Sequence, residues 1–591
     1  MSKNSLEKLI FWQWLVFAVL VLVVGCEASR YGKVADDEVY GILDSRRQAV
    51  LGKTNQFRID TDISKRSPED INGSEIVRDR YLGSSGQFWE KTGTGVQQKL
   101  TLEKALELAE QANRTYQSNR EKLYLAALSL TGTRHQFALK FTKSSVDLGI
   151  ERKSNGKLRG NSDADLTLQK MLKTGGTISA TLANDLVLYF DGKPKVPSIT
   201  LSLAQPLLRG AGADIAAEIL TQAERNVIYE VRDFNHYQKD FAVEIVNDYF
   251  SLLQQGESMR LSYNNYTNRI FFRKEIEARV AAGLQSEFEA KQALESEYNQ
   301  KLSYISSTNS YQNSLDDFKQ KLSLPLGERL ALDFSELVKL KEQAIINQET
   351  GKKELPVVPL TDRLGYRLAI TNRLDIMNEV DRFEDSKRKV KVSRNDLLPS
   401  LSIVADATLK DQFYSSFQPE DFTANAGLKL DLPLDQLSER NKYRQSLINF
   451  ERQLRTLAIR LDSLRDGVRT DVRNLTRQKE NYFTQREALK NADESLLATR
   501  QRLRLGFPGV RTRDIITAQD ALERAQQSVL SAIVDYQKTR LKLLKDVGIL
   551  DTSVKGFWLE NQSVPGVKAM LQNPADGSSI QLIPPQEILR N

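Results

Sequence analysis

Side chains that could perform chemistry are scarce in this sequence. Its 591 residues include one cysteine and only two histidines, His135 and His236. So few histidines do not favour a histidine-based metal site or catalytic triad, and no Gly-rich phosphate loop accompanies them. The histidines are expected to be surface or packing residues. We therefore predict that the chain is not an enzyme and uses no cofactor and no metal.

Charge and composition narrow the class of protein further. The chain is 40% hydrophobic and 27% charged, which fits neither a disordered chain nor an ordinary polytopic membrane protein. A net charge of +7 is small for this length. Because no recognition motif accompanies the basic balance, no nucleic acid is expected among the partners.

Charged side chains gather just after a turn signal at 505–509. They are Asp514 and its neighbours Arg511 and Arg513. One interpretation is that Asp514 lies in the first turn of a helix, where the helix dipole favours a carboxylate. The other is that copies of Asp514 from several chains form an acidic ring, which would constrict a pore and bind cations. The sequence leaves both interpretations open.

The N-terminus has the features of a secretion signal. Two lysines precede an uncharged run, 9–25, that is short for a membrane-spanning helix. The small residues before Cys26 resemble the lipobox of bacterial lipoproteins, in which the chain is cut before the cysteine and the cysteine is acylated. We predict a signal peptide over 1–25 and lipid attachment at Cys26, with an ordinary signal or a retained anchor as the alternative. By the same resemblance, Glu27 favours sorting to the outer membrane.

Long amphipathic helices must form most of the chain. Apolar residues between Leu447 and Val468 recur at gaps of three and four, which predicts a helix that packs as a coiled coil. It would continue to Gly506 and be followed by a return helix, 514–544. The first half predicts the same pair, a long helix through 227–252 that turns at 281–284, with a return helix over 287–322. Helices of about 70 residues are roughly 100 Å long, so they must pack against other long helices.

The two halves share one order of elements, which indicates a duplication. Gly283 corresponds to Gly506, and Gly327 corresponds to Gly548. We divide the chain into a signal peptide (1–25), a lipid-anchored N-terminal extension (26–98), a first repeat (99–327), an equatorial connector (328–360), a second repeat (361–550) and a C-terminal tail (551–591).

Each repeat is expected to supply two amphipathic strands between its helices. Alternation covers 137–142 and 177–203 in the first repeat, with a loop over 151–176, and it covers 401–409 and 423–432 in the second. Strands of about ten residues match the span of a tilted membrane β-strand. Four strands cannot close a barrel, and lipid does not tolerate an open sheet edge. Several chains must therefore share one barrel.

Several segments in this order resemble the outer-membrane efflux protein family (TolC-like). They are Asn372–Ile376, Leu398–Ser402, Arg502–Gly506, Asp514–Gln519 and Pro206–Gly210. The resemblance covers about 100–550, although Leu374 stands where the family usually has proline. It implies an α+β membrane protein built from a duplicated unit of helix, two strands and a long helical hairpin. It also implies a homotrimer whose 12-stranded β-barrel continues into an α-helical periplasmic barrel.

The resemblance also implies partners and sites. The chain would be a passive exit duct in the outer membrane, with a large periplasmic portion, contacting outer-membrane lipid and working with a periplasmic adaptor and an inner-membrane pump of RND or ABC type. The adaptor would dock at the hairpin tips, which comprise Gly283, Leu284, Gly506, Phe507, Pro508 and Gly509. Asp514, with Arg511 and Arg513, would form the pore gate. The alternative is a periplasmic coiled-coil lipoprotein that serves as an adaptor or scaffold; the strands and the duplication favour the duct.

Overall fold

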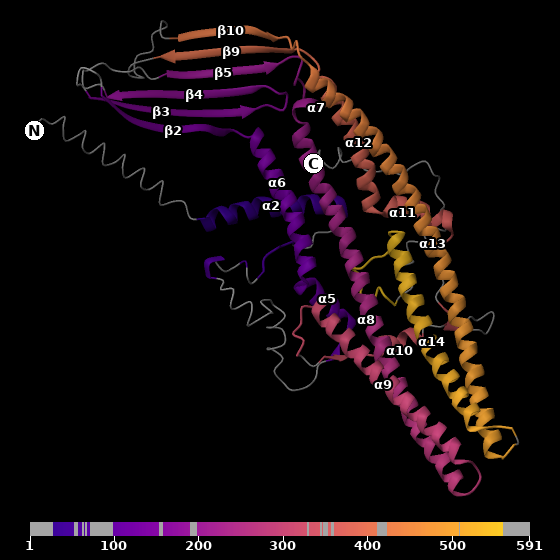
Figure 1. The fold of residues 1–591 in the computed structure, drawn as a ribbon. Coiled ribbons are helices and arrows are strands. Elements are labelled where there is room, and N and C mark those ends of the chain that lie inside the picture. Colours follow the sequence, from indigo (N-terminus) through magenta and orange to yellow (C-terminus); the bar gives the residue numbers. More distant parts are fainter. Residues whose placement is uncertain are drawn as a thin grey trace, which may run out of the picture.

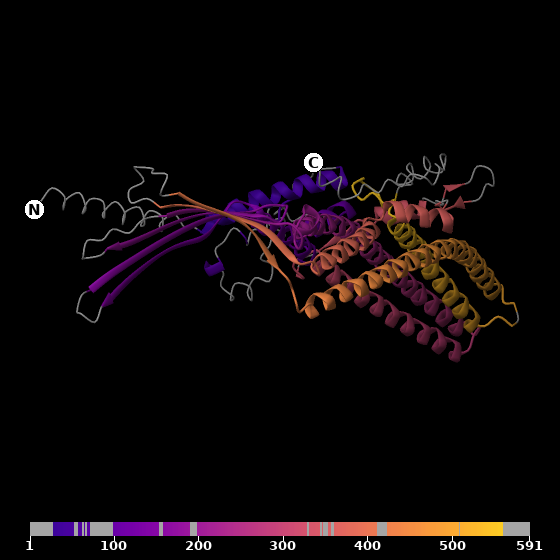
Figure 2. The same cartoon turned by 90° about the horizontal axis from the view of Figure 1, so that it is seen from above.

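The protein is elongated, with a β-sheet at one end and two helical hairpins that end together at the other (Figure 1). A computed structural model describes residues 28–52, 57–61, 64, 68–70, 99–152, 158–188, 198–327, 330–342, 345–346, 353–355, 358, 360–410, 422–507 and 509–559. The strands run away from the helices as one twisted layer (Figure 2).

Two long hairpins form the helical end. The first pairs α8 (Glu218–Ala281) with α9 (Glu287–Lys321), and the second pairs α13 (Leu437–Arg504) with α14 (Thr512–Asp546). These bounds confirm the predicted long helices and their return helices. At the two turns Gly283 and Gly506 have φ of 73° and 70°, a conformation that glycine adopts without steric cost.

Shorter helices precede the strands in each half. They are α5 (Leu102–Ala112) and α6 (Arg114–Phe137) in the first, and α11 (Asp362–Asn372) and α12 (Leu374–Asn395) in the second. Thr101 and Thr361 cap α5 and α11 in the same way, each accepting a hydrogen bond from a backbone N–H three residues on. The other described elements are α2 (Ala28–Leu51), η1 (Pro68–Asp70), α7 (Ala213–Ala216), α10 (Ser335–Glu342) and the short strands β1 (Lys99–Leu100), β6 (Ala331–Leu332), β7 (Ile345–Ile346) and β8 (Lys353–Glu354).

The large sheet has six strands, in the order β10–β9–β5–β4–β3–β2. Four come from the first half, β2 (Lys140–Arg152), β3 (Leu158–Met171), β4 (Thr177–Leu188) and β5 (Ser198–Pro206), and two from the second, β9 (Ser400–Lys410) and β10 (Phe422–Asp431). The expectation of four strands per chain is therefore wrong. The stretch expected to be a loop, 151–176, contains β3, and Phe137 ends a helix instead of starting a strand. β3 escaped notice because its sequence is polar and its backbone is held by pairing on both sides. Three such sheets would hold eighteen strands, not the expected twelve.

The main core lies midway along the helices, around α8. Val246, Tyr249 and Leu253 of α8 are fully buried there. The N-terminal extension begins with α2, which lies across α6 (Figure 1) and buries Val39 and Leu43 in the same core. The N-terminal extension therefore contains a helix that packs on the body.

Candidate functional site

One face of the six-stranded sheet is apolar and exposed. The pairing places Leu166 opposite Leu182, which in turn lies opposite Ile199. Directly opposed residues share a face of a sheet, so the pairing assigns the exposed apolar residues of all six strands to this face. They are Phe141, Leu166, Ile178, Leu182, Leu201, Leu203, Ile403, Phe422, Leu428 and Leu430. Ten large apolar side chains on one exposed face indicate contact with a membrane or a partner.

The opposite face of the sheet is polar. A row of threonines crosses five strands in register: Thr167, Thr181, Thr200, Thr408 and Thr423. The hydroxyl oxygens of Thr167 and Thr181 lie 3.2 Å apart, as do those of Thr200 and Thr408. A second polar row comprises Gln169, Ser179, Ser202, Asp406 and Asn425. A sheet with one apolar face and one polar face has the alternation found in the wall of a transmembrane barrel.

The sheet meets the helices at two corners that are tied together. The Leu207 N–H donates to the Leu401 carbonyl at 2.7 Å, and Arg209 forms an ion pair with Glu439 at 3.2 Å. Leucines around the corners are exposed, including Leu432 and Leu434, which is 98% exposed. These exposed leucines extend the apolar surface of the sheet towards the helices.

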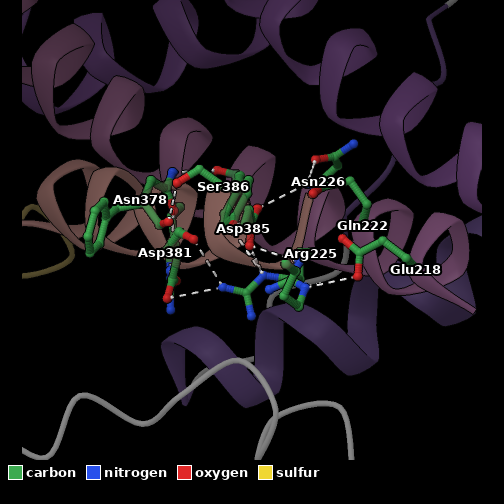
Figure 3. A network of polar contacts seen from close by, with 12 residues as sticks. Glu218, Gln222, Arg225, Asn226, Asn378, Asp381, Asp385 and Ser386 are labelled. Carbon is green, nitrogen blue, oxygen red and sulfur yellow. Dashed lines mark hydrogen bonds and ion pairs between the residues drawn. The ribbon is translucent and has the colours of Figure 1, made fainter. Parts of the chain in front are cut away.

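Below the corners a buried ionic network joins the two halves of the chain (Figure 3). On α8, Arg225 is 2% exposed, and its Nε lies 2.6 Å from Asp385 of α12. Arg225 and Arg232 both pair with Asp381, and the Tyr229 hydroxyl donates to Asp385 at 2.7 Å. Buried charges need such partners because a lone charge is costly away from water.

The network continues towards the sheet. Arg388 of α12 pairs with Glu218 at 3.0 Å and with Asp385 at 2.9 Å. Burial raises the pKa of the Asp381 carboxyl, against the opposing effect of Arg232 and Arg225. Burial, together with the hydrogen bond to Asp385, also raises the pKa of the Tyr229 hydroxyl. The arrangement fixes α12 against α8.

The helical tips are exposed and hold two matching caps. In the first tip the Glu289 side chain accepts from the Ser286 N–H at 3.2 Å, and in the second Asp514 accepts from the Arg511 N–H at 2.9 Å. Leu284 and Phe507 at the two turns are both exposed. Each tip therefore combines a capped return helix with an exposed apolar side chain.

Above the tips a buried arginine links the two hairpins. Arg269 of α8 forms an ion pair with Asp520 and a hydrogen bond with Gln519, both on α14. Burial lowers the pKa of its guanidinium, against the opposing charges of Asp520 and Glu523. Beside it Phe272 and Ile276 pack with Leu503 and Ile515 in a small apolar cluster. These contacts hold the two hairpins together.

Comparison with known proteins assigns the second half of the chain. Residues 365–548 match the family model described as outer membrane efflux protein. The chain carries an outer membrane efflux protein domain. No curated protein matched the sequence.

Solved structures share the fold of this chain. The outer-membrane channel OprN has a TM-score of 0.56 at 14% identity, covering 77% of this chain and 90% of its own. The Campylobacter jejuni CmeC outer membrane channel has a TM-score of 0.53 at 14% identity, and the match covers 81% of this chain and 90% of CmeC. The open state of the Neisseria gonorrhoeae MtrE outer membrane channel has a TM-score of 0.54 at 13% identity, and the match covers 76% of this chain and 88% of MtrE. The predicted TolC-like resemblance is confirmed.

The predicted site residues have separate outcomes. Gly283, Leu284, Gly506, Phe507 and Gly509 lie at the tips as predicted. Asp514, Arg511 and Arg513 are exposed beside the second tip, where Asp514 caps α14 as the first interpretation of the sequence expected. Cys26 and Pro508 lie outside the described residues. Docking, gating and lipid attachment stay predictions.

Sequence reasoning missed the residues that join the two halves. Arg225, Arg232 and Arg269 occupy polar positions on α8 whose acidic partners lie 149 or more residues away. Because only the packing of α8 on α12 and α14 brings them together, helical periodicity contains no signal for them. In the described residues no helix is long and apolar enough to span a membrane, and no group of acids, histidines or cysteines could hold a metal.

Proposed function

We propose that three copies of this chain form an outer-membrane exit duct that empties an efflux or secretion system. The sheets would share one β-barrel in the outer membrane, and the hairpins would form a tunnel through the periplasm. The duct is passive, so an inner-membrane pump of RND or ABC type would supply the energy and a periplasmic adaptor would join the two. Cys26 would anchor each chain in the lipid.

The two-faced sheet is the observation that supports this proposal. An apolar outer face suits lipid, and the threonine rows suit a water-filled lumen. The same chain continues directly into helices such as α13, whose 68 residues are about 100 Å long. A membrane wall that continues into long helices has the form of a conduit.

The tips would control passage. Opening requires the second hairpin to move against the first, and Arg269 is a buried ionic contact between them, beside the apolar cluster of Phe272 and Ile515. An adaptor that binds Leu284 and Phe507 better in the open arrangement would shift the equilibrium towards it. Three copies of Asp514 would add an acidic ring at the constriction, with Arg511 and Arg513 beside it.

The mass and conductance of the detergent-extracted protein test this proposal. A trimer that conducts in a planar bilayer is expected, with small conductance while the tips are closed. Arg269→Ala should raise the conductance several-fold because it frees the hairpins from each other. Arg455→Ala, an exposed arginine of the same chain with a partner at 3.9 Å, is the matched control and should leave it unchanged.

One result would contradict the duct, and another would contradict only the role of Arg269. A monomer without conductance would leave the chain as a periplasmic coiled-coil adaptor or scaffold, the alternative that the two-faced sheet and the family assignment do not support. A conducting trimer in which Arg269→Ala has no effect would keep the duct and remove the proposed tip contact.

A further inference from the structure

The β2–β3 hairpin gives the sheet two strands beyond the two expected from each repeat. Building on the proposed duct, we propose that the open edge of β2 pairs with the open edge of β10 in the neighbouring copy, so that three sheets of six strands close into one barrel of eighteen. The partner of both edges is a second copy of this chain.

The β2–β3 hairpin is an integral part of the sheet. The register pairs twelve positions between β2 and β3 and twelve between β3 and β4. By comparison, β4 and β5 pair over seven positions, from Thr177 to Ala183. A hairpin paired this extensively belongs to the wall itself, and β2 then forms one of its two edges.

The two edges have the polarity needed to join. All neighbouring strands of the sheet are antiparallel. β2 leaves α6 and runs away from the helices, whereas β10 runs back towards α13 (Figure 1). When copies are arranged around a ring, β2 of one meets β10 of the next in antiparallel orientation. Edges left unpaired in lipid would leave backbone N–H and C=O groups without partners.

The described side chains of the hairpin continue both faces of the sheet. Phe141 of β2 lies opposite Leu168, which shares the apolar face with Leu166. Thr167 and Gln169 open the two polar rows on the other face. The membrane face and the lumen face therefore extend into the β2–β3 hairpin without inversion.

The circumference of an eighteen-stranded barrel also matches that of the ring of helices. With strands about 4.8 Å apart and tilted by about 40°, twelve strands give a circumference of roughly 75 Å and eighteen give roughly 110 Å. The four helices that join the sheet, α6, α8, α12 and α13, would form a ring of twelve in a trimer. Helices packed 8–10 Å apart give a ring of roughly 95–120 Å. The wider barrel fits the helical tunnel beneath it.

The wider barrel changes which part of the duct selects cargo. A backbone diameter near 36 Å, against about 24 Å for twelve strands, roughly doubles the cross-section. Barrels of 16–18 strands leave an open aqueous channel. The membrane portion would then place no tighter size limit on cargo than the tunnel does, and the limit would lie at the helical tips.

Cysteine cross-linking tests the pairing of β2 with β10. Lys143→Cys on β2 is combined in turn with a cysteine at each position of β10, 422–431, and the membranes are oxidised. Covalent dimers and trimers at neighbouring β10 positions are expected. Lys143→Cys combined with cysteines over 177–182 of β4, an interior strand, is the control and should give monomers.

The outcomes separate the two proposals. A native trimer without any β2–β10 cross-link would overturn the eighteen-stranded barrel and leave the duct intact. A chain that does not form trimers would overturn the duct itself, and the shared barrel with it.

The size of reagents that reach the lumen tests the width of the barrel. Ser202 lies in the second polar row, so Ser202→Cys can be labelled from the cell exterior with maleimide-polyethylene glycols of graded mass. A variant in which a short linker replaces 140–176 retains only four strands and should exclude reagents that label the full sheet, with at least a tenfold drop in rate. The parent chain without Ser202→Cys is the control. Equal size limits for both sheets would contradict the wider barrel.

Discussion

The two long helices α8 and α13 are similar in length and differ sharply in burial. α8 has 64 residues, and 23 of them are buried, whereas α13 has 68 residues and buries only six. Both open a hairpin in their repeat, and both follow a strand of the same sheet. The first is the central helix of the chain, and the second lies at its margin.

This difference shows that one chain alone buries the apolar surface of α8 but not that of α13. The heptad seam predicted on α13 is buried at Leu464 and Val468 but open at Leu454, which is 48% exposed. Apolar residues in a coiled-coil seam need a facing helix. The half of the seam nearer the sheet therefore indicates where a neighbouring copy would pack.

The largest effect is expected from a charge placed in each helix. Val246→Asp on α8 buries an unpaired carboxylate, which costs more than about 4 kcal/mol, and should abolish folded protein. Leu454→Asp on α13 should change the stability of the monomer by less than about 0.5 kcal/mol but dissociate the trimer. Denaturant unfolding and native mass measure the two effects. Equal loss of stability in both variants would show that α13 is as much a part of the core of one chain as α8.

Arginines give the next largest contrast. Arg225→Met should cost about 3 kcal/mol because it removes the cation that Asp385 and Asp381 share, and the remaining partners of these buried carboxylates only partly compensate their charge. Arg455→Met on α13 removes an exposed pair and should cost less than about 1 kcal/mol. The midpoint of denaturant unfolding reports both. A cost for Arg225→Met as small as for Arg455→Met would show that the network is not a structural tie.

Burial beside α8 also makes the stability of the fold depend on alkaline pH. Tyr116 of α6 packs against Phe234 and Phe241 of α8, and burial raises its pKa to about 12. Above pH 10 the unfolded chain loses this proton while the folded chain keeps it. Stability should therefore fall between pH 10 and 12, by about 2.7 kcal/mol for this group.

Tyr116→Phe should remove that share of the alkaline loss, measured as the slope of unfolding free energy against pH. Gln238→Leu takes away the hydrogen-bond partner of the hydroxyl and keeps the phenol, so it should retain the slope. An unchanged slope in Tyr116→Phe would mean that the phenol is not sequestered by α8.

The smallest effect is expected at the tips, where the two hairpins are alike. Asp514→Ala and Glu289→Ala each remove one cap and should cost about 1 kcal/mol. Only Asp514→Ala should change cation conductance if three copies of Asp514 line the constriction. Bilayer recordings of both variants decide this, and equal conductance would leave Asp514 as a cap alone.

Sequence reasoning identified the long helices and the family because both depend on local signals. Heptad spacing and the glycines of the turns locate α8, α9, α13 and α14 and the ends of the hairpins. The helices α8 and α13 begin at Glu218 and Leu437, ahead of the seams that predicted them. It missed β3 because strand pairing with β2 and β4, and not apolar alternation, holds that segment in the sheet. It also missed Arg225 and Arg269, whose partners are set by the packing of distant helices.

The open edges of the sheet also have a genetic consequence. If three copies of the chain complete each ring, a copy that assembles but cannot pair its edge strand would disable the two copies beside it. When a normal and a defective gene are expressed together, most rings would contain a faulty member. Mutations in β2 or β10 should then behave as dominant in cells, whereas mutations that prevent folding, such as those in α8, should be recessive.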